Sequence, residues 1–192
     1  MPSALTFEQT ITRFVFVASQ SLHPNVAGLR WFMQDVWPTI KTKMPGTTIE
    51  VIGNWSPAAQ NSLPNHEDIR FAGFVADLSR ALQNKIMIVP VWIGSGIRTK
   101  ILAAWSASCP VVTTTIGAEG LPGCSGEHFV VADDAPSFAG ACIELSQNLE
   151  KLNRMAANGL DLVKKNYSLA AVRKTRLEIY NKLLANHQRL KS

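Results

Sequence analysis

The chain has 192 residues, of which 46% are hydrophobic and 17% are charged, and its mean hydropathy is +0.06. These values exclude a disordered, collagen-like or low-complexity chain, and the length suits one domain, or one domain with a helical appendage. Residues 1–150 hold nine basic and twelve acidic side chains, whereas residues 151–192 hold ten basic and two acidic ones. The formal net charge of +5 therefore comes from the C-terminal part.

The basic C-terminal part lacks the interleaved aromatic residues of a nucleic-acid surface, so we expect no nucleic-acid partner. A solvated helix face is the simplest interpretation, and contact with an anionic membrane surface is the next. We recognise no membrane-spanning run and no secretory leader. The three cysteines are too widely spaced for a disulfide framework or a CxxC metal site. We expect a cytoplasmic protein, peripheral at the inner face of the membrane if the basic part binds lipid.

Short apolar runs alternate with helical patterns along most of the chain. Strands are predicted over 13–18, 47–52, 69–72, 85–89, 110–113 and 128–131. Helices are predicted from His23 to Met44, with Pro38 as a kink or split, and over 76–83, 97–107, 137–149, 151–165 and 168–185. This alternation predicts an α/β fold: a Rossmann-like parallel sheet with helices on both faces and a helical C-terminal tail.

Three segments follow from this reading. Residues 1–12 are interpreted as a linker, residues 13–150 as the Rossmann-like domain, and residues 151–192 as basic helices that pack on it through an apolar stripe. That stripe comprises Leu169, Val172, Ile179, Tyr180 and Leu183. Asp133 and Asp134 precede the helix over 137–149 and are interpreted as capping residues.

Ligands of such sheets bind at the carboxyl ends of the strands. The loops that follow the strands there span 19–25, 53–56, 73–75, 90–97 and 114–120. The run from Pro90 to Lys100 leads from a strand end through Gly94 and Gly96 to a helix start, an arrangement that suits a phosphate. Taken alone, a tight loop that merely packs helix on sheet explains these residues equally well. The motifs GxSxG and HExxH are absent, and we see no close His/Cys/Asp cluster in the sequence.

An ordered set of short matches runs through residues 14–180. They are Phe14–Ser19 with His23–Asn25, Val51–Gly53, Phe71–Val75 with Asp77–Leu78, Ile88–Pro90, Gly94–Leu102, Cys109–Leu121, Gly126–His128 and Ala132–Asp134. In these residues the chain resembles the C-terminal half of retaining, GT-B-fold glycosyltransferases of family 4 (group 1). The stretch from Gly94 to Leu121 is the specific part of the resemblance.

The resemblance implies that the domain binds a nucleotide-sugar donor, UDP- or GDP-linked, without a metal or other cofactor. Gly53 and Asn54, with Gly73, Phe74 and Val75, would then flank the nucleobase. The diphosphate would lie on Gly94, Ser95, Gly96, Ile97, Arg98, Thr99 and Lys100. Thr115, Ile116 and Gly117 would line the floor beneath the donor, and Glu119 belongs to the same substrate-binding set. No catalytic residue is assigned.

Two departures from the family pattern bear on function. The family carries two glutamates separated by seven residues, and the corresponding positions here are Ser95 and Ala103. The N-terminal GT-B half, which would act in cis or in trans, is not part of this sequence. We therefore expect the donor half of a glycosyltransferase that is inactive alone. The alternative is a catalytically inactive GT-B-like module that serves partner assembly or weak nucleotide binding.

Overall fold

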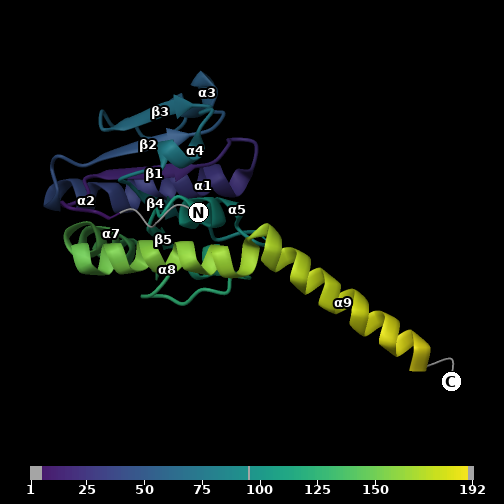
Figure 1. The fold of residues 1–192 in the computed structure, drawn as a ribbon. Coiled ribbons are helices and arrows are strands. Elements are labelled where there is room, and N and C mark those ends of the chain that lie inside the picture. Colours follow the sequence, from purple (N-terminus) through teal and green to yellow (C-terminus); the bar gives the residue numbers. More distant parts are fainter. Residues whose placement is uncertain (1–5, 95, 190–192) are drawn as a thin grey trace.

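The computed structural model describes residues 6–94 and 96–189, and within them six strands form one parallel sheet in the order β3-β2-β1-β4-β5-β6 (Figure 1). The strands are β1 (Arg13–Val17), β2 (Thr48–Ile52), β3 (Ile69–Gly73), β4 (Ile86–Val89), β5 (Val111–Thr113) and β6 (Val130–Val131). This order reverses direction between β1 and β4, so the carboxyl ends of these two strands flank the crevice where such sheets bind ligands.

Helices connect the strands and then continue to the C-terminus. They are α1 (His23–Trp31), the π-helix η1 (Phe32–Val36), α2 (Trp37–Lys43), α3 (Pro57–Asn61), α4 (Leu78–Ala81), α5 (Thr99–Ser106), α6 (Thr115–Ala118), α7 (Ala135–Gln147), α8 (Leu149–Tyr167) and α9 (Leu169–Arg189). No helix was predicted at the position of α3, and α6 lies within the loop predicted over 114–120.

Alternate residues of the central strands face two separate apolar cores. Phe14 and Phe16 of β1 pack with α1, η1, α2 and α7 on one face of the sheet. Val15, on the same strand, packs with Ile101 and Trp105 of α5 on the other face. Strands β1 and β4 are almost completely buried, as expected for a parallel sheet that helices cover on both sides.

The helix that begins at His23 is split where Pro38 enters it, as the sequence predicts. The N–H of Trp37 donates to the carbonyl oxygen of Phe32, which produces one π-turn. Proline has no N–H and its ring disturbs the preceding turn, so the hydrogen-bond register changes just before it.

The two acidic residues before α7 hold different backbone groups. Asp134 caps α7 by accepting from the N–H of Ser137 at 2.8 Å, and hydrogen bonding from Ser137 lowers the pKa of its carboxyl. Asp133 instead accepts from the N–H of Thr115 at 2.7 Å and from its hydroxyl at 2.6 Å. It thereby joins the end of β6 to the start of α6.

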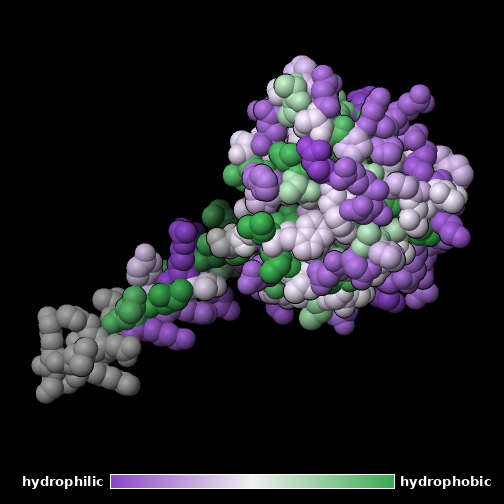
Figure 2. Space-filling view, turned by 180° about the vertical axis from the view of Figure 1, so that it is seen from behind, coloured by the Kyte–Doolittle hydropathy of each residue, from purple (hydrophilic) through white to green (hydrophobic). Residues whose placement is uncertain are grey.

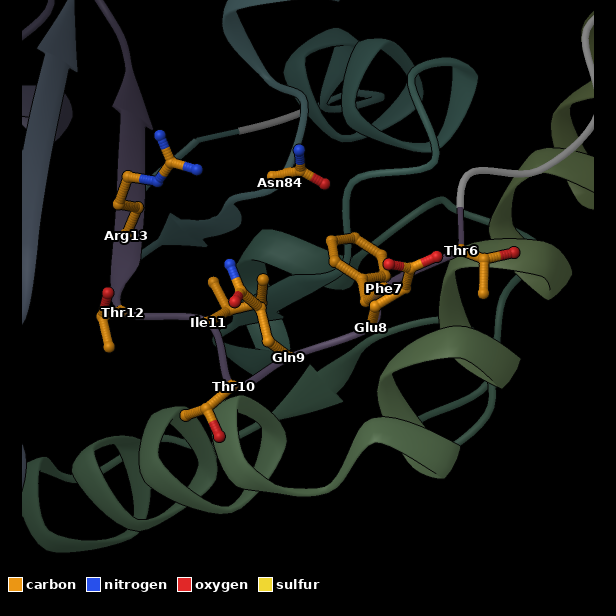
Figure 3. Close-up of a pocket in the computed structure, with 9 residues that line it drawn as sticks. All are labelled: Thr6, Phe7, Glu8, Gln9, Thr10, Ile11, Thr12, Arg13 and Asn84. Carbon is orange, nitrogen blue, oxygen red and sulfur yellow. The ribbon is translucent and has the colours of Figure 1, made fainter.

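The described part of the N-terminal segment lies against the C-terminal helices of the domain. Phe7 is buried and exchanges two hydrogen bonds with the side chain of Asn153 on α8, and the N–H of Ile11 donates to the carbonyl oxygen of Ser146 at 3.1 Å. Residues 6–13 and Asn84 line a cavity of about 430 Å³ at the amino ends of the strands (Figure 3). Residues 1–5 of the predicted linker lie outside the described residues.

The two last helices behave differently from each other. Helix α8 packs along the domain and buries Leu152, Met155 and Leu160. Helix α9 extends away from the domain (Figure 1), and Leu169 and Tyr180 of its predicted stripe are 86% and 62% exposed. For α9 the expected packing on the domain is therefore wrong: periodicity reveals an apolar face but not what covers it.

Candidate functional site

Two cavities open at the carboxyl ends of the strands. The first, of about 690 Å³, lies between the β1–α1 loop and the β4–α5 connection, at the reversal of strand order. Its lining includes Ser19, Leu22, Asn25, Ile93, Gly94, Ile97, Arg98, Thr99, Lys100 and Ala103. The second, of about 520 Å³, is lined by Ser19–Ser21, Gly53–Ser56 and Gly73. Ser19 belongs to both linings, so the two cavities share a border.

The glycine-rich connection folds around the side chain of Arg98. The guanidinium donates from Nη1 to the carbonyl oxygen of Gly96 at 3.0 Å, and from Nη2 to that of Ile116 at 3.4 Å. Gly94 has a φ of +146°, and a Cβ at this position would lie 2.9 Å from Nη2 of Arg98. The sequence predicted a helix from residue 97, which would place Arg98 in its first turn. Helix α5 instead begins at Thr99, so Arg98 is its N-cap residue.

The side chain of Lys100 points from the start of α5 toward α1, across the crevice between β1 and β4. Its Nζ donates to Oδ1 of Asn25 at 3.1 Å and lies 5.3 Å from the centroid of the Phe16 ring. Asn25 in turn donates from Nδ2 to the carbonyl oxygen of Ser19 at 2.9 Å. Burial, and secondarily the charge of Arg98, lowers the pKa of Lys100 to about 8. Two cations that do not share a helix face thus line one cavity.

The loops after β2 and β3 are joined at the second cavity. The N–H of Gly53 donates to the carbonyl oxygen of Gly73 at 2.8 Å, and Nε1 of Trp55 donates to that of Ala18 at 2.8 Å. Gly53 has a φ of +131°, and a Cβ there would lie 2.0 Å from the oxygen of Ala18. This contact requires glycine. Gly53, Asn54 and Gly73 therefore meet in one place, as predicted for residues around one ligand.

The remaining predicted site residues are less tightly grouped. Ile116 is linked to the first cavity through Arg98, and Gly117 is buried beside Thr113. Phe74 and Glu119 are exposed, and neither they nor Val75 and Thr115 line the two cavities. Ser95 lies outside the described residues. A role in donor binding stays a prediction for each member of the set.

The fold brings together two groups of residues that were not predicted to meet. Asn25 lies within the loop over 19–25, but its contact with Lys100 joins positions 75 residues apart, so no local pattern reveals it. Cys124, Glu127 and His128 hold possible metal ligands within 4.8 Å of one another. The spacing Cys-x-x-Glu-His could have signalled this cluster.

Comparison with known proteins decides the family. Residues 12–148 match the family described as "Glycosyl transferases group 1". The chain belongs to this family. It is 29% identical over 163 residues to the "Uncharacterized 44.6 kDa protein in cps region" of Klebsiella pneumoniae, a match that covers 80% of this chain and 42% of that protein. The chain thus spans less than half of this relative.

Solved structures share the fold. TarM of S. aureus superposes with a TM-score of 0.73 at 12% identity, covering 94% of this chain and 37% of that one. HepE of Anabaena, solved with UDP and glucose, gives 0.68 at 16% identity over 88% of this chain and 48% of that one. The C-terminal domain of the glycosyl transferase group 1 protein LpcC of Francisella tularensis gives 0.63 at 23% identity over 84% and 89%.

The predicted fold and family are therefore confirmed: the chain has the Rossmann-like half of a GT-B fold with a helical C-terminal region. Within the residues that the structure describes, no helix combines the length and the apolar character that crossing a bilayer demands.

Proposed function

We propose that the chain is the donor-binding half of a glycosyltransferase, and that it holds a nucleoside-diphosphate sugar at the carboxyl ends of β1 and β4. The observation that carries the proposal is the cavity there, which the start of α5, Arg98 and Lys100 all line. Membership of the glycosyl transferases group 1 family supports sugar transfer as the activity of the whole protein. Similar folds solved with ligands, among them HepE with UDP and glucose, support the donor class.

The proposed arrangement assigns each part of the donor to a different loop. The diphosphate would accept from the first N–H groups of α5 and face the two cations, because a helix start and positive side chains both favour an anion. The base would enter the neighbouring cavity beside Gly53 and Gly73. Ala103 lines the phosphate cavity but offers no carboxylate to a ribose, and a charge-assisted hydrogen bond contributes about 1.5–3 kcal/mol.

A titration with UDP, GDP and ADP tests the proposal by calorimetry or NMR. We expect dissociation constants of about 0.1–1 mM, which correspond to about 4–5.5 kcal/mol. Arg98→Ala should weaken binding by about 1.5–3 kcal/mol, the value of a lost charge-assisted bond. Arg80→Ala is the matched control, because Arg80 is exposed on α4 outside the cavity lining.

The same titration, repeated with an Ala103 variant, tests where the ribose lies. Ala103→Glu should strengthen nucleotide binding if the ribose lies beside this position. Nucleotide binding that is indifferent to Arg98→Ala would contradict the phosphate assignment. If millimolar nucleotide shifts no resonance of residues 94–100 or 53–56, the donor proposal fails and the chain is a non-catalytic module. Ala103 and the engagement of Lys100 by Asn25 favour that second candidate.

For its partners, we propose that the chain works with an N-terminal GT-B half, in cis or in trans, and in the cytoplasm. An anionic membrane surface is the proposed contact of α9. Arg173, Lys174, Arg176 and Lys182 are exposed on this helix and support that contact.

A further inference from the structure

A compact group of three potential metal ligands lies outside the proposed donor site, on the loop between α6 and β6. Cys124, Glu127 and His128 each offer one ligand atom, and these atoms lie within 4.8 Å of one another. Cys124 and Glu127 are exposed, and the side chain of His128 is 16% exposed. A cation from solvent can therefore reach the group.

The loop that carries these residues is held on three sides. Nε1 of Trp105 on α5 donates to the carbonyl oxygen of His128 at 2.9 Å, and Nδ2 of Asn158 on α8 donates to that of Glu127 at 3.1 Å. The N–H of Val131 on β6 donates to Oγ of Ser125 at 3.0 Å. These bonds fix the backbone of the loop, so the three side chains lie close together before any metal binds.

Hydrogen bonding sets the orientation of the histidine. Its Nδ1 accepts from the N–H of Cys124 at 3.2 Å and lies 4.0 Å from Oε2 of Glu127. A ring nitrogen that accepts a hydrogen bond carries no proton, so the neutral ring bears its proton on Nε2. The lone pair of Nδ1 is thus directed at the Cys124 N–H, so a metal ion bound through Nδ1 would replace this hydrogen bond.

We propose that Cys124, Glu127 and His128 form a binding site for a zinc-class divalent cation. A thiolate, an imidazole and a carboxylate are ligands that zinc takes in proteins, and water completes a tetrahedral set of three protein ligands. Thiolate and imidazole disfavour Mg²⁺ and Ca²⁺, which prefer oxygen. Ligand atoms of one tetrahedral zinc lie roughly 3.3–3.8 Å apart. The exposed side chains of Cys124 and Glu127 close the remaining gap by rotation.

The proposed metal site lies apart from the donor cavity, and metal binding there should affect stability. None of its three ligands lines either cavity at the carboxyl ends of the strands. The metal would cross-link three side chains within the loop, which Trp105 and Asn158 already join to α5 and α8. Because a cation that binds only the folded chain stabilises it, Zn²⁺ should raise the melting temperature.

Cobalt substitution tests the coordination directly. One equivalent of Co²⁺ added to the reduced, full-length protein should produce the absorption of thiolate-to-cobalt charge transfer, and Zn²⁺ should abolish it. Cys124→Ser should lack this absorption, because the other two cysteines are buried in the core. The same addition of Mg²⁺ or Ca²⁺ should leave the melting temperature unchanged.

Zinc affinity in variants completes the test. Changes around a metal site that do not remove a ligand already cost about 10–100-fold in affinity, so Cys124→Ser, Glu127→Gln and His128→Gln should each lose at least about tenfold. Glu150→Gln, at an exposed glutamate on α8, should bind as wild type does. His128 packs edge-on against Trp105, with ring centroids 6.3 Å apart, so circular dichroism checks the fold of each variant without metal. If His128→Gln does not fold, the exposed Cys124→Ser decides.

Two outcomes overturn the proposal. One is a wild-type protein that shows no cobalt–thiolate absorption and no stoichiometric zinc. The other is a folded Cys124→Ser that binds zinc with wild-type affinity.

Discussion

Lys100 carries its charge where burial opposes it. Its pKa falls from an ordinary 10.5 to about 8, first because the side chain is buried and then because Arg98 repels it. Between pH 8 and 10.5 the unfolded chain therefore holds more protons than the folded chain, so the free energy of unfolding rises with pH in this window. A diphosphate beside Lys100 would offset part of this penalty, which connects the shift to the proposed function.

We expect Lys100→Met to remove this pH dependence. Relative to the variant, the wild type should gain up to about 3 kcal/mol of stability between pH 7 and pH 10.5. Urea unfolding of both proteins across this range measures the difference. Buried Cys109, whose pKa is raised to about 12, acts in the opposite direction above pH 9 because its thiol ionises only in the unfolded chain. That effect is common to both proteins and cancels.

The matched control is Lys165→Met, because Lys165 is exposed on α8. Its stability should follow the wild-type curve at every pH. Parallel curves for wild type and Lys100→Met would contradict the assignment of a depressed pKa to Lys100.

At the scale of elements, the contact of α5 with α8 depends on a missing side chain. A Cβ on Gly159 of α8 would lie 2.5 Å from Cδ1 of Trp105. That indole cannot move away easily, since it stacks on Phe129 with centroids 5.8 Å apart and donates to the carbonyl oxygen of His128. Gly140 of α7, in contrast, has nothing within 4 Å of an added Cβ.

Alanine at these two helix positions should therefore act with opposite sign. Gly140→Ala should raise the free energy of unfolding by about 0.5–1 kcal/mol, because alanine costs less backbone entropy in a helix. Gly159→Ala gains the same amount but overpacks the contact, which costs about 1–3 kcal/mol, so we expect a net loss of about 1 kcal/mol. Chemical denaturation measures both. If Gly159→Ala instead stabilises the protein, the Trp105 ring must move to accommodate the added methyl group, and the expected overpacking would be wrong.

The elements that could be predicted from the sequence are those with a repeating apolar pattern. The long helices have this pattern, and the six strands are recognisable as short apolar runs between them. The predicted bounds of both differ from the observed ones by a few residues. Helix α3 is too short for a period, although Ser56 before Pro57 is a recognisable cap and start. The glycine-rich loop was predictable because its residues are contiguous. The pairing of Asn25 with Lys100 was not, because it exists only after β1 and β4 become neighbours.

At the scale of the whole molecule, α9 is the feature that departs most from a packed domain. Figure 2 shows apolar side chains along the projecting helix, and Leu177, Ile179 and Leu183 are each more than half exposed. Four cations lie exposed on the same helix. A surface that satisfies both kinds of side chain must be apolar and negatively charged, as the interface of an anionic bilayer is.

Vesicle binding tests that proposal. The chain should sediment with anionic phospholipid vesicles at low salt and much less with neutral ones. Binding should weaken as salt shortens the screening length to roughly 8–10 Å. Exchange of Lys174 and Lys182 for glutamate should reduce it, whereas Lys43→Glu, at an exposed lysine on α2, should not. Equal binding to neutral vesicles would exclude an electrostatic contact.

Catalysis is the property that we expect this chain to lack when it is alone. The proposed donor cavity is built from one half of a fold, and the chain spans 42% of its K. pneumoniae relative. Sugar transfer requires an acceptor oriented against the donor and charge stabilisation around both. Arg98 and Lys100 line the cavity proposed for the diphosphate. Its rim carries apolar residues instead, with Leu22 and Ile93 62% and 65% exposed.

The purified 192-residue chain should therefore bind nucleotide yet release none from UDP- or GDP-linked sugars above the rate of the Arg98→Ala variant. Binding and release are measured in the same sample, by NMR titration and by a coupled nucleotide assay. Binding without release supports a donor half that needs a second half for chemistry. Release that depends on both Arg98 and an added acceptor would prove that this half carries a complete active site, and the requirement for the other half would then be wrong.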